Sequence, residues 1–141
     1  MMKGFGHMAI WVTDMERALH FYVDILGCKK AFSMENNGKP GTEYLALANG
    51  AFIELFYNGV PHEQESPGEG RFYAGFSHFA VEVDDIFETV EGIKARGGVL
   101  SVEPKRGHDG NWQAWIIDPE GIGIEFVQLE PDCKQKQVYF E

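Results

Sequence analysis

Two short stretches of the chain, residues 7–12 and 78–83, alternate apolar residues with polar or small ones. This period of two is typical of a β-strand whose two faces have different surroundings. In both stretches one face is apolar, and the other carries a histidine followed two positions later by an alanine. We predict that the apolar face packs against a helix, while the histidine face leaves room for something bulkier than a side chain.

A helical pattern follows each of these strands. Apolar residues recur there at spacings of three and four, at Met15, Leu19, Tyr22 and Leu26 in the first copy and at Ile86, Val90 and Ile93 in the second. The segment 13–16 has the form of a capping box that starts at Thr13, and Asp84 or Asp85 can cap the second helix. Gly27 and the pair at 97–98 are suited to end the two helices.

Three further strands are predicted after each helix. In both halves the helix is followed by a short strand (30–33 and 99–102) and a Gly-rich polar loop (34–42 and 104–111). A hairpin comes next, and its last strand carries a glutamate. Each half is therefore a βαβββ module of the α+β class. Within one domain of 141 residues we expect module 1 at about 4–58, a linker at about 59–75, module 2 at about 76–130 and a loosely held polar tail at 131–141.

The two modules are copies at a fixed offset. His7 and His78 are 71 positions apart (78 − 7), and Glu54 and Glu125 are separated by the same distance along the chain (125 − 54). Such a repeat determines how the fold is interpreted. Here it also bears on function, because His and Glu are ligands of divalent metals.

The joint His–Glu pattern favours a metal site over the ordinary interpretations of these residues. A single His on a strand is usually a hydrogen-bonded core residue, and a single Glu near a strand end is usually solvated. Glu54 and Glu125, however, each lie between apolar residues, where an ionised carboxylate is costly unless it is paired or bound to a cation. Two facing half-sites would place two imidazoles and two carboxylates on one ion. The other histidines lack the pattern and are predicted to be surface residues: His20, His62 and His108.

Charge and composition exclude several classes of function. A net charge of −10 argues against binding to a phosphate backbone, which requires clustered Lys and Arg. No run of 18 apolar residues occurs, and the N-terminus lacks a basic segment followed by an apolar one, so we expect neither a membrane span nor a signal peptide. Cys28 and Cys133 lack CxxC spacing and suit thiols in a reducing cytoplasm.

The chain resembles the vicinal oxygen chelate superfamily, and most of all its small bacterial glyoxalase I-type proteins of the lactoylglutathione lyase family. The resemblance extends from about Gly4 to Leu129, and the segments that carry it are 6–10 (GHMAI), 18–27 (ALHFYVDILG), 52–58 (FIELFYN), 77–85 (SHFAVEVDD) and 118–126 (DPEGIGIEF). It implies paired βαβββ modules that curve into an open barrel around a metal site. It also implies that the four ligands of one divalent ion are His7, Glu54, His78 and Glu125.

The resemblance further suggests which residues contact substrate. Trp11 stands where bacterial glyoxalase I has an Arg that anchors glutathione, so the use of glutathione is in question. Asn58 matches a glutathione-contacting Asn, and Lys105 or Arg106 is able to meet a carboxylate. Three tryptophans favour a more aromatic pocket, Trp11, Trp112 and Trp115, although core packing explains Trp115 equally well.

We therefore expect a divalent-metal-dependent lyase or isomerase that acts on a small substrate with vicinal oxygens through an enediolate. By resemblance Glu125 is the general base, with Glu54 opposite. The donor set suits Ni, Zn, Co, Mn or Fe without choosing among them. The alternatives are an Fe(II) extradiol-type dioxygenase, against which the second carboxylate counts, and a non-catalytic small-molecule-binding protein of the resistance type.

Assembly and partners complete these expectations. In many relatives of this size the site is completed across a dimer, with one His–Glu pair from each subunit. We expect a homodimer that binds a small molecule and neither nucleic acid nor membrane. The alternative is that the two modules of a single chain close on each other.

Overall fold

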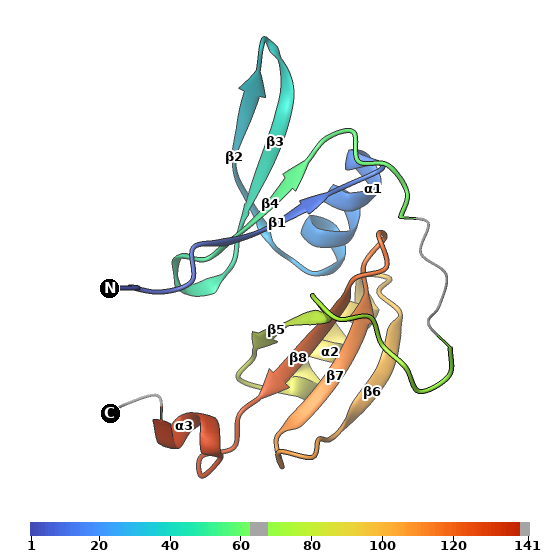
Figure 1. Ribbon diagram of the computed structural model, residues 1–141. Helices are drawn as coiled ribbons and strands as arrows, with labels where there is room; N and C mark the ends of the chain where they lie inside the picture. The colour runs from blue at the N-terminus through green and yellow to red at the C-terminus, as the bar shows by residue number, and fades with distance from the viewer. Residues whose placement is uncertain (63–67, 139–141) are drawn as a thin grey trace. The chain divides into compact units, whose positions relative to one another are not determined.

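The computed structural model describes residues 1–62 and 68–138, and its contacts divide the chain into two compact units, 1–69 and 70–141 (Figure 1). The first unit, module 1, contains β1 (His7–Trp11), α1 (Met15–Leu19) continued by the π-helical η1 (His20–Ile25), β2 (Lys29–Asn36), β3 (Lys39–Ala46), the short η2 (Ala48–Gly50) and β4 (Phe52–Phe56). The second, module 2, contains β5 (His78–Glu82), α2 (Ile86–Ala95), β6 (Leu100–Arg106), β7 (Trp112–Ile117), β8 (Gly123–Gln128) and α3 (Lys134–Val138).

Each module is one four-stranded mixed sheet with the same topology. The strand orders are β1-β4-β3-β2 and β5-β8-β7-β6. The first strand of each module pairs in parallel with the last, and the remaining pairs are antiparallel. Both sheets are open, so β1, β2, β5 and β6 are edge strands. The predicted α+β class and the repeated βαβββ order are confirmed.

The apolar face of each sheet forms the core of its module, as the alternation predicted. In module 2, α2 contacts β6, β7 and β8, and its whole predicted stripe is buried. The core residues that are at most 2% exposed include Tyr22, Leu45, Ile53 and Leu55 in module 1 and Ile86, Val90, Ile93, Ile116 and Ile124 in module 2. Truncating such a side chain to Ala typically costs about 2–5 kcal/mol. The opposite face of each sheet therefore remains available for a site.

The helix ends show one difference from the sequence analysis. Asp14, not Thr13, caps α1, because the Asp14 carboxylate accepts the backbone N–H of Arg17 at 3.0 Å. The Thr13 hydroxyl instead accepts from the Arg17 guanidinium at 3.0 Å. Of the two predicted alternatives for α2, Asp85 is the cap. In the described part of the chain, no helix has both the length and the apolar character needed to cross a membrane.

The predicted polar loop at 34–42 is wrong: this segment forms a long hairpin. β2 continues to Asn36 and β3 begins at Lys39, so only Asn37 and Gly38 form the turn. Both have positive φ, 53° and 74°, as a type I′ turn requires. The counterpart loop at 104–111 shrinks to 107–111. Asn-Gly is a strong hairpin signal, and the polar composition around it concealed the strands.

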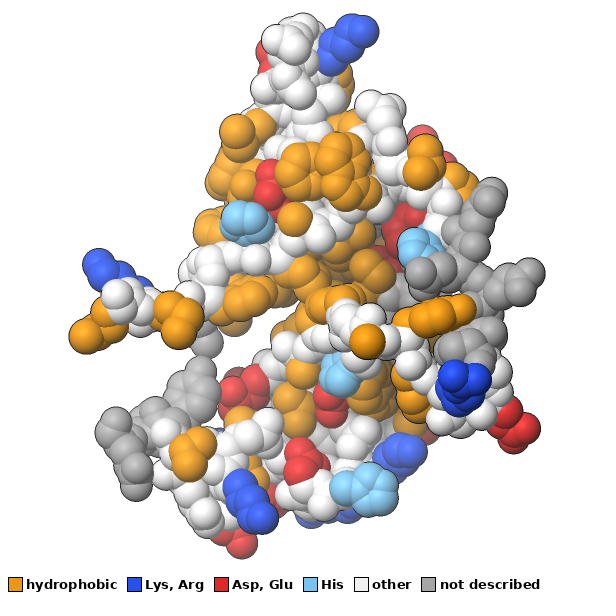
Figure 2. All heavy atoms as spheres, in the orientation of Figure 1, with side chains coloured by type: hydrophobic (Ala, Val, Ile, Leu, Met, Phe, Trp, Pro, Cys, Tyr) orange, Lys and Arg blue, Asp and Glu red, His pale blue; other side chains and the backbone are white. Residues whose placement is uncertain are grey.

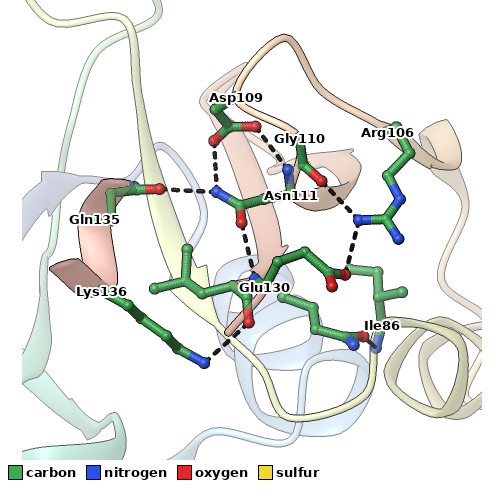
Figure 3. A network of polar contacts seen from close by, with 10 residues as sticks. Ile86, Arg106, Asp109, Gly110, Asn111, Glu130, Gln135 and Lys136 are labelled. Carbon is green, nitrogen blue, oxygen red and sulfur yellow. Dashed lines mark hydrogen bonds and ion pairs between the residues drawn. The ribbon is translucent and has the colours of Figure 1, made fainter. Parts of the chain in front are cut away.

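Part of the predicted polar tail, Lys134–Val138, forms α3. Figure 3 shows α3 tied to the sheet of module 2, where the Asn111 side chain donates to Gln135 at 2.8 Å and Lys136 donates to the Leu129 carbonyl at 3.0 Å. Cys133, just before α3, is 7% exposed. Residues 139–141 lie outside the described part of the chain, as do residues 63–67 of the predicted linker.

Candidate metal and substrate site

Each module brings its own His and Glu together on the open face of its sheet. Nε2 of His7 on β1 lies 3.3 Å from a carboxylate oxygen of Glu54 on the neighbouring β4. In module 2, Nε2 of His78 on β5 lies 3.2 Å from a carboxylate oxygen of Glu125 on β8. The glutamate side chains are 10% and 16% exposed, and the histidines 47% and 35%. Each pair thus joins a sheltered carboxylate to a more accessible imidazole.

The donor set of each pair fits a divalent metal ion. Metal–ligand bonds of about 2.0–2.2 Å place neighbouring donors roughly 3–3.5 Å apart, which matches both His–Glu distances. Within the described residues, no group of three or more His, Cys, Asp and Glu side chains is placed to hold a metal. Each module by itself presents two donors, and the four-ligand set remains a prediction.

Tyr44, which the sequence analysis missed, is a third member of the module 1 site. It lies directly opposite Glu54 in the pairing of β3 with β4. Burial and a hydrogen bond to the Glu54 carboxylate raise the pKa of Tyr44. Its ring also stands edge-on to the His7 imidazole, with centroids 5.9 Å apart. Tyr44 thus contacts both members of the pair.

The equivalent position in module 2 is occupied by Trp115, opposite Glu125. Its ring lies edge-on to His78, with centroids 4.6 Å apart, but its indole N–H donates to Gln113 at 2.8 Å rather than to the glutamate. Among the described residues, His78 is the partner that the structure gives Glu125. Of the two glutamates that pair with a histidine, Glu54 is the one with a tyrosine hydroxyl as a described hydrogen-bond partner.

Two of the predicted substrate residues, Trp11 and Asn58, line one cavity in module 1 together with Glu54. The cavity has a volume of about 490 Å³, and Lys39, Thr42 and Phe56 are among its other lining residues. Trp11 stacks on Phe56, with ring centroids 4.6 Å apart and an interplanar angle of 26°. Figure 2 shows hydrophobic side chains gathered over the strands of module 1, around a histidine and an acidic side chain.

The two cationic residues predicted to contact substrate, Arg106 and Lys105, lie in different surroundings. Arg106 pairs with Glu130 at 2.7 Å and donates to the Gly110 carbonyl at 2.6 Å (Figure 3). It also lies over the ring of Trp112. It is therefore committed to the network around α3. Lys105 is exposed on β6.

The remaining histidines lie on the surface, as predicted. His62 and His108 are exposed, and His20 forms an exposed contact with Asp24 at 2.8 Å. None of the three belongs to either His–Glu pair. The open faces of the two sheets thus carry the candidate site.

Fold and site together define a protein of two βαβββ modules, each with a His–Glu pair on the open face of its sheet. Residues 4–126 match the Glyoxalase/Bleomycin resistance protein/Dioxygenase superfamily, and the chain belongs to this superfamily. The resemblance seen in the sequence is thereby confirmed.

Curated relatives of the chain carry the name lactoylglutathione lyase. The chain is 34% identical over 127 residues to a probable lactoylglutathione lyase of Vibrio cholerae, covering 86% of this chain and 88% of that protein. It is 34% identical over 128 residues to the lactoylglutathione lyase of Haemophilus influenzae, covering 86% and 90%. Among solved structures, a glyoxalase I mutant from Zea mays is similar with a TM-score of 0.69 and 25% identity, over 89% of this chain and 44% of that one.

Proposed function

We propose that this protein is a metal-dependent lyase of the glyoxalase I type. The observation that carries the proposal is the presence of a His–Glu pair at matching positions of both modules, 3.3 Å and 3.2 Å apart. The relatives named lactoylglutathione lyase support the same reaction class. The substrate is a small molecule with two adjacent oxygens, such as a hemithioacetal or a hydroxy-ketone. Free thiols at Cys28 and Cys133 suit action in the cytoplasm.

His7, Glu54, His78 and Glu125 would together hold one divalent ion. Two imidazoles and two carboxylates accept Ni²⁺, Zn²⁺, Co²⁺, Mn²⁺ or Fe²⁺. When bound, the ion supplies Lewis-acid stabilisation of the negative charge that develops on the two substrate oxygens.

Glu125 is the general base in this proposal. It takes the proton from the hydroxyl-bearing carbon of the substrate, leaving an enediolate, and returns it to the neighbouring carbon that held the carbonyl, so that no atom is gained or lost. For this proton transfer the glutamate carboxylate has to move toward the substrate carbon. Glu54 is less free to move, because Tyr44 donates a hydrogen bond to it, whereas the residue opposite Glu125 is Trp115, which donates elsewhere.

A homodimer is the assembly that we propose for the complete site, with one His–Glu pair from each subunit. Protein interfaces have an apolar, partly aromatic centre. Module 1 supplies apolar side chains for such a surface outside the cavity beside Glu54, because Phe5 is 70% and Phe32 47% exposed. Light scattering tests this assembly, and a monomer that binds metal stoichiometrically would contradict it.

The reaction is tested with metal-loaded protein and hemithioacetals of methylglyoxal with glutathione and with aromatic thiols. We expect thioester formation, followed by absorbance, and its loss in the double variant His7→Ala/His78→Ala. Bound metal without turnover of any hemithioacetal would reject the lyase and favour a small-molecule-binding protein.

A further inference from the structure

We propose that the cavity beside Glu54 binds a flat aromatic group that carries one carboxylate, and that it selects an aryl-bearing substrate over one built on glutathione. This specificity rests on the lyase function proposed above. All of the residues that carry it belong to module 1.

The aromatic preference follows from the Trp11–Phe56 stack. The two residues are cross-strand partners on β1 and β4, and their rings are offset-stacked at 4.6 Å. Trp11 nevertheless remains 63% exposed, so much of its ring is free to cover a ligand. An indole face favours an aromatic ring over an aliphatic or peptide group, since stacked aromatic pairs gain about 0.5–1.5 kcal/mol beyond the area that they bury.

Thr42 marks a position for a hydrogen bond inside the cavity. It pairs with Phe56 on one side and with Met34 on the other, which places its side chain on the same face as Trp11. Thr42 is only 6% exposed, and its hydroxyl has no hydrogen-bond partner within the part of the chain that the structure describes. A buried hydroxyl without a partner is costly, so an oxygen atom of a ligand that reached it would relieve this cost.

The cavity offers one cationic side chain to a ligand carboxylate. Lys39, at the start of β3, is the one cation among the residues that line the cavity, and no ion pair is recorded for it within residues 1–62 and 68–138. Glu35 and Glu54 supply negative charge there. Glutathione carries two carboxylates and an ammonium group, and it would leave one carboxylate without a cation. An aromatic monocarboxylate needs only Lys39.

The test uses 2-naphthoate as an aromatic probe, with cyclohexanecarboxylate and glutathione as comparisons. Isothermal titration calorimetry on the purified full chain measures binding and requires neither turnover nor added metal. We expect 2-naphthoate to bind at least roughly twofold more tightly than either comparison compound, which corresponds to the lower end of the stacking energy.

Variants assign the binding to individual residues. We expect Trp11→Ala to weaken 2-naphthoate by about tenfold. Lys39→Gln should weaken it by about two- to fivefold, and less at high salt. Lys29→Gln, an exposed lysine on β2 of the same module that does not line the cavity, is the matched control and should change nothing.

A stability measurement separates a ligand-binding role of Thr42 from a structural one. Thr42→Val keeps the shape of the side chain and removes the unpaired hydroxyl. It should weaken 2-naphthoate by about threefold without lowering the melting temperature, and Thr42→Ser should restore binding. A melting temperature that falls in Thr42→Val would assign the hydroxyl to the fold and contradict this part of the proposal.

The outcomes also distinguish this inference from the proposed reaction. If 2-naphthoate binds through Trp11 but no hemithioacetal is turned over, the cavity assignment stands and the lyase function fails. If the glutathione hemithioacetal is turned over while 2-naphthoate does not bind, or binds equally well to Trp11→Ala, the inference is overturned and the lyase function stands.

Discussion

Module 1 and module 2 share one topology and one His–Glu geometry, yet they differ in what surrounds the pair. His7 lies beside Phe52 and Glu54 beside Tyr44, whereas His78 lies beside Gly123. A Cβ at Gly123 would lie 3.5 Å from the His78 Cβ and 3.6 Å from the Trp115 ring, which is ordinary van der Waals contact. The comparison teaches that the repeat preserves the proposed ligands while their surroundings have diverged. Glu54 has Tyr44 as a hydrogen-bond partner in addition to His7, whereas the partner of Glu125 among the described residues is His78.

The cores differ as well. Glu43 of module 1 is 5% exposed on the face that packs inward, and the position 71 residues later is Ala114, which is 0% exposed. Glu43 accepts hydrogen bonds from Ser33 at 2.5 Å and Tyr57 at 2.9 Å and pairs with Lys30 at 3.0 Å. Module 1 therefore contains a buried carboxylate that makes the stability of its fold depend on pH. Module 2 has an apolar residue at the matching position.

The division of labour between the glutamates gives the largest expected effect. Glu125→Gln keeps an oxygen ligand but removes the base, so turnover should fall by about 10²–10⁴-fold while much of the metal is retained. Glu54→Gln should be milder. Steady-state kinetics with parallel metal analysis measures both, and wild-type turnover in Glu125→Gln would make the role assignment wrong.

Metal occupancy tests whether the two pairs serve one ion. His78→Ala and His7→Ala should each weaken metal affinity by at least about 100-fold, because each removes a ligand and not merely a supporting group. Metal analysis after dialysis provides the measurement, and His20→Ala is the matched control. Full retention of metal in the double variant His7→Ala/His78→Ala would refute the site.

The Tyr44 hydroxyl beside Glu54 should contribute to metal affinity, whereas Trp115 at the matching position of module 2 should not. Tyr44→Phe removes the hydroxyl that donates to Glu54, and we expect metal affinity to fall by about tenfold. Trp115→Phe, its counterpart opposite Glu125, should leave metal affinity nearly unchanged. Competition with a chelator measures the metal affinity of both variants. Equal losses of affinity would contradict the proposed difference between the modules.

The pH dependence of stability sharpens the comparison of the cores. Burial opposes ionisation of Glu43, but hydrogen bonds from Ser33, Lys30 and Tyr57 outweigh it and lower the pKa of Glu43 from 4.5. The ionised Glu43 carboxylate therefore contributes to the free energy of unfolding. Its contribution is fully present above pH 4.5 and is lost as the pH falls through the lower folded-state pKa. Glu43→Gln should lose about 1 kcal/mol near neutral pH.

Urea denaturation across the acid range checks this expectation. The difference between wild type and Glu43→Gln should shrink as the pH falls below the ordinary carboxyl range, and Glu103→Gln, an exposed glutamate, is the control. A difference that grows toward acid pH would mean that the sign is wrong.

Local patterns were sufficient for much of the fold. The order of strands and helices, the buried stripe of α2 and the end of the first helix at Gly27, where φ is 83°, all followed from spacings within a few residues. The capping box misled by one position, since Thr13 and Asp14 are both good caps and only the observed hydrogen bond chooses Asp14. The turn at 37–38 was missed among polar neighbours, although it sets the register of β2 and β3.

The sequence by itself determined the two modules and the His and Glu positions in register, because strand and helix periodicities and a repeat offset are properties of neighbouring residues. Tertiary structure decided that Tyr44 contacts Glu54, and that Thr42 and Trp11 share one cavity. These contacts join residues on different strands, and they depend on hairpin length and register. A change of one residue in register would move each side chain to the other face of the sheet.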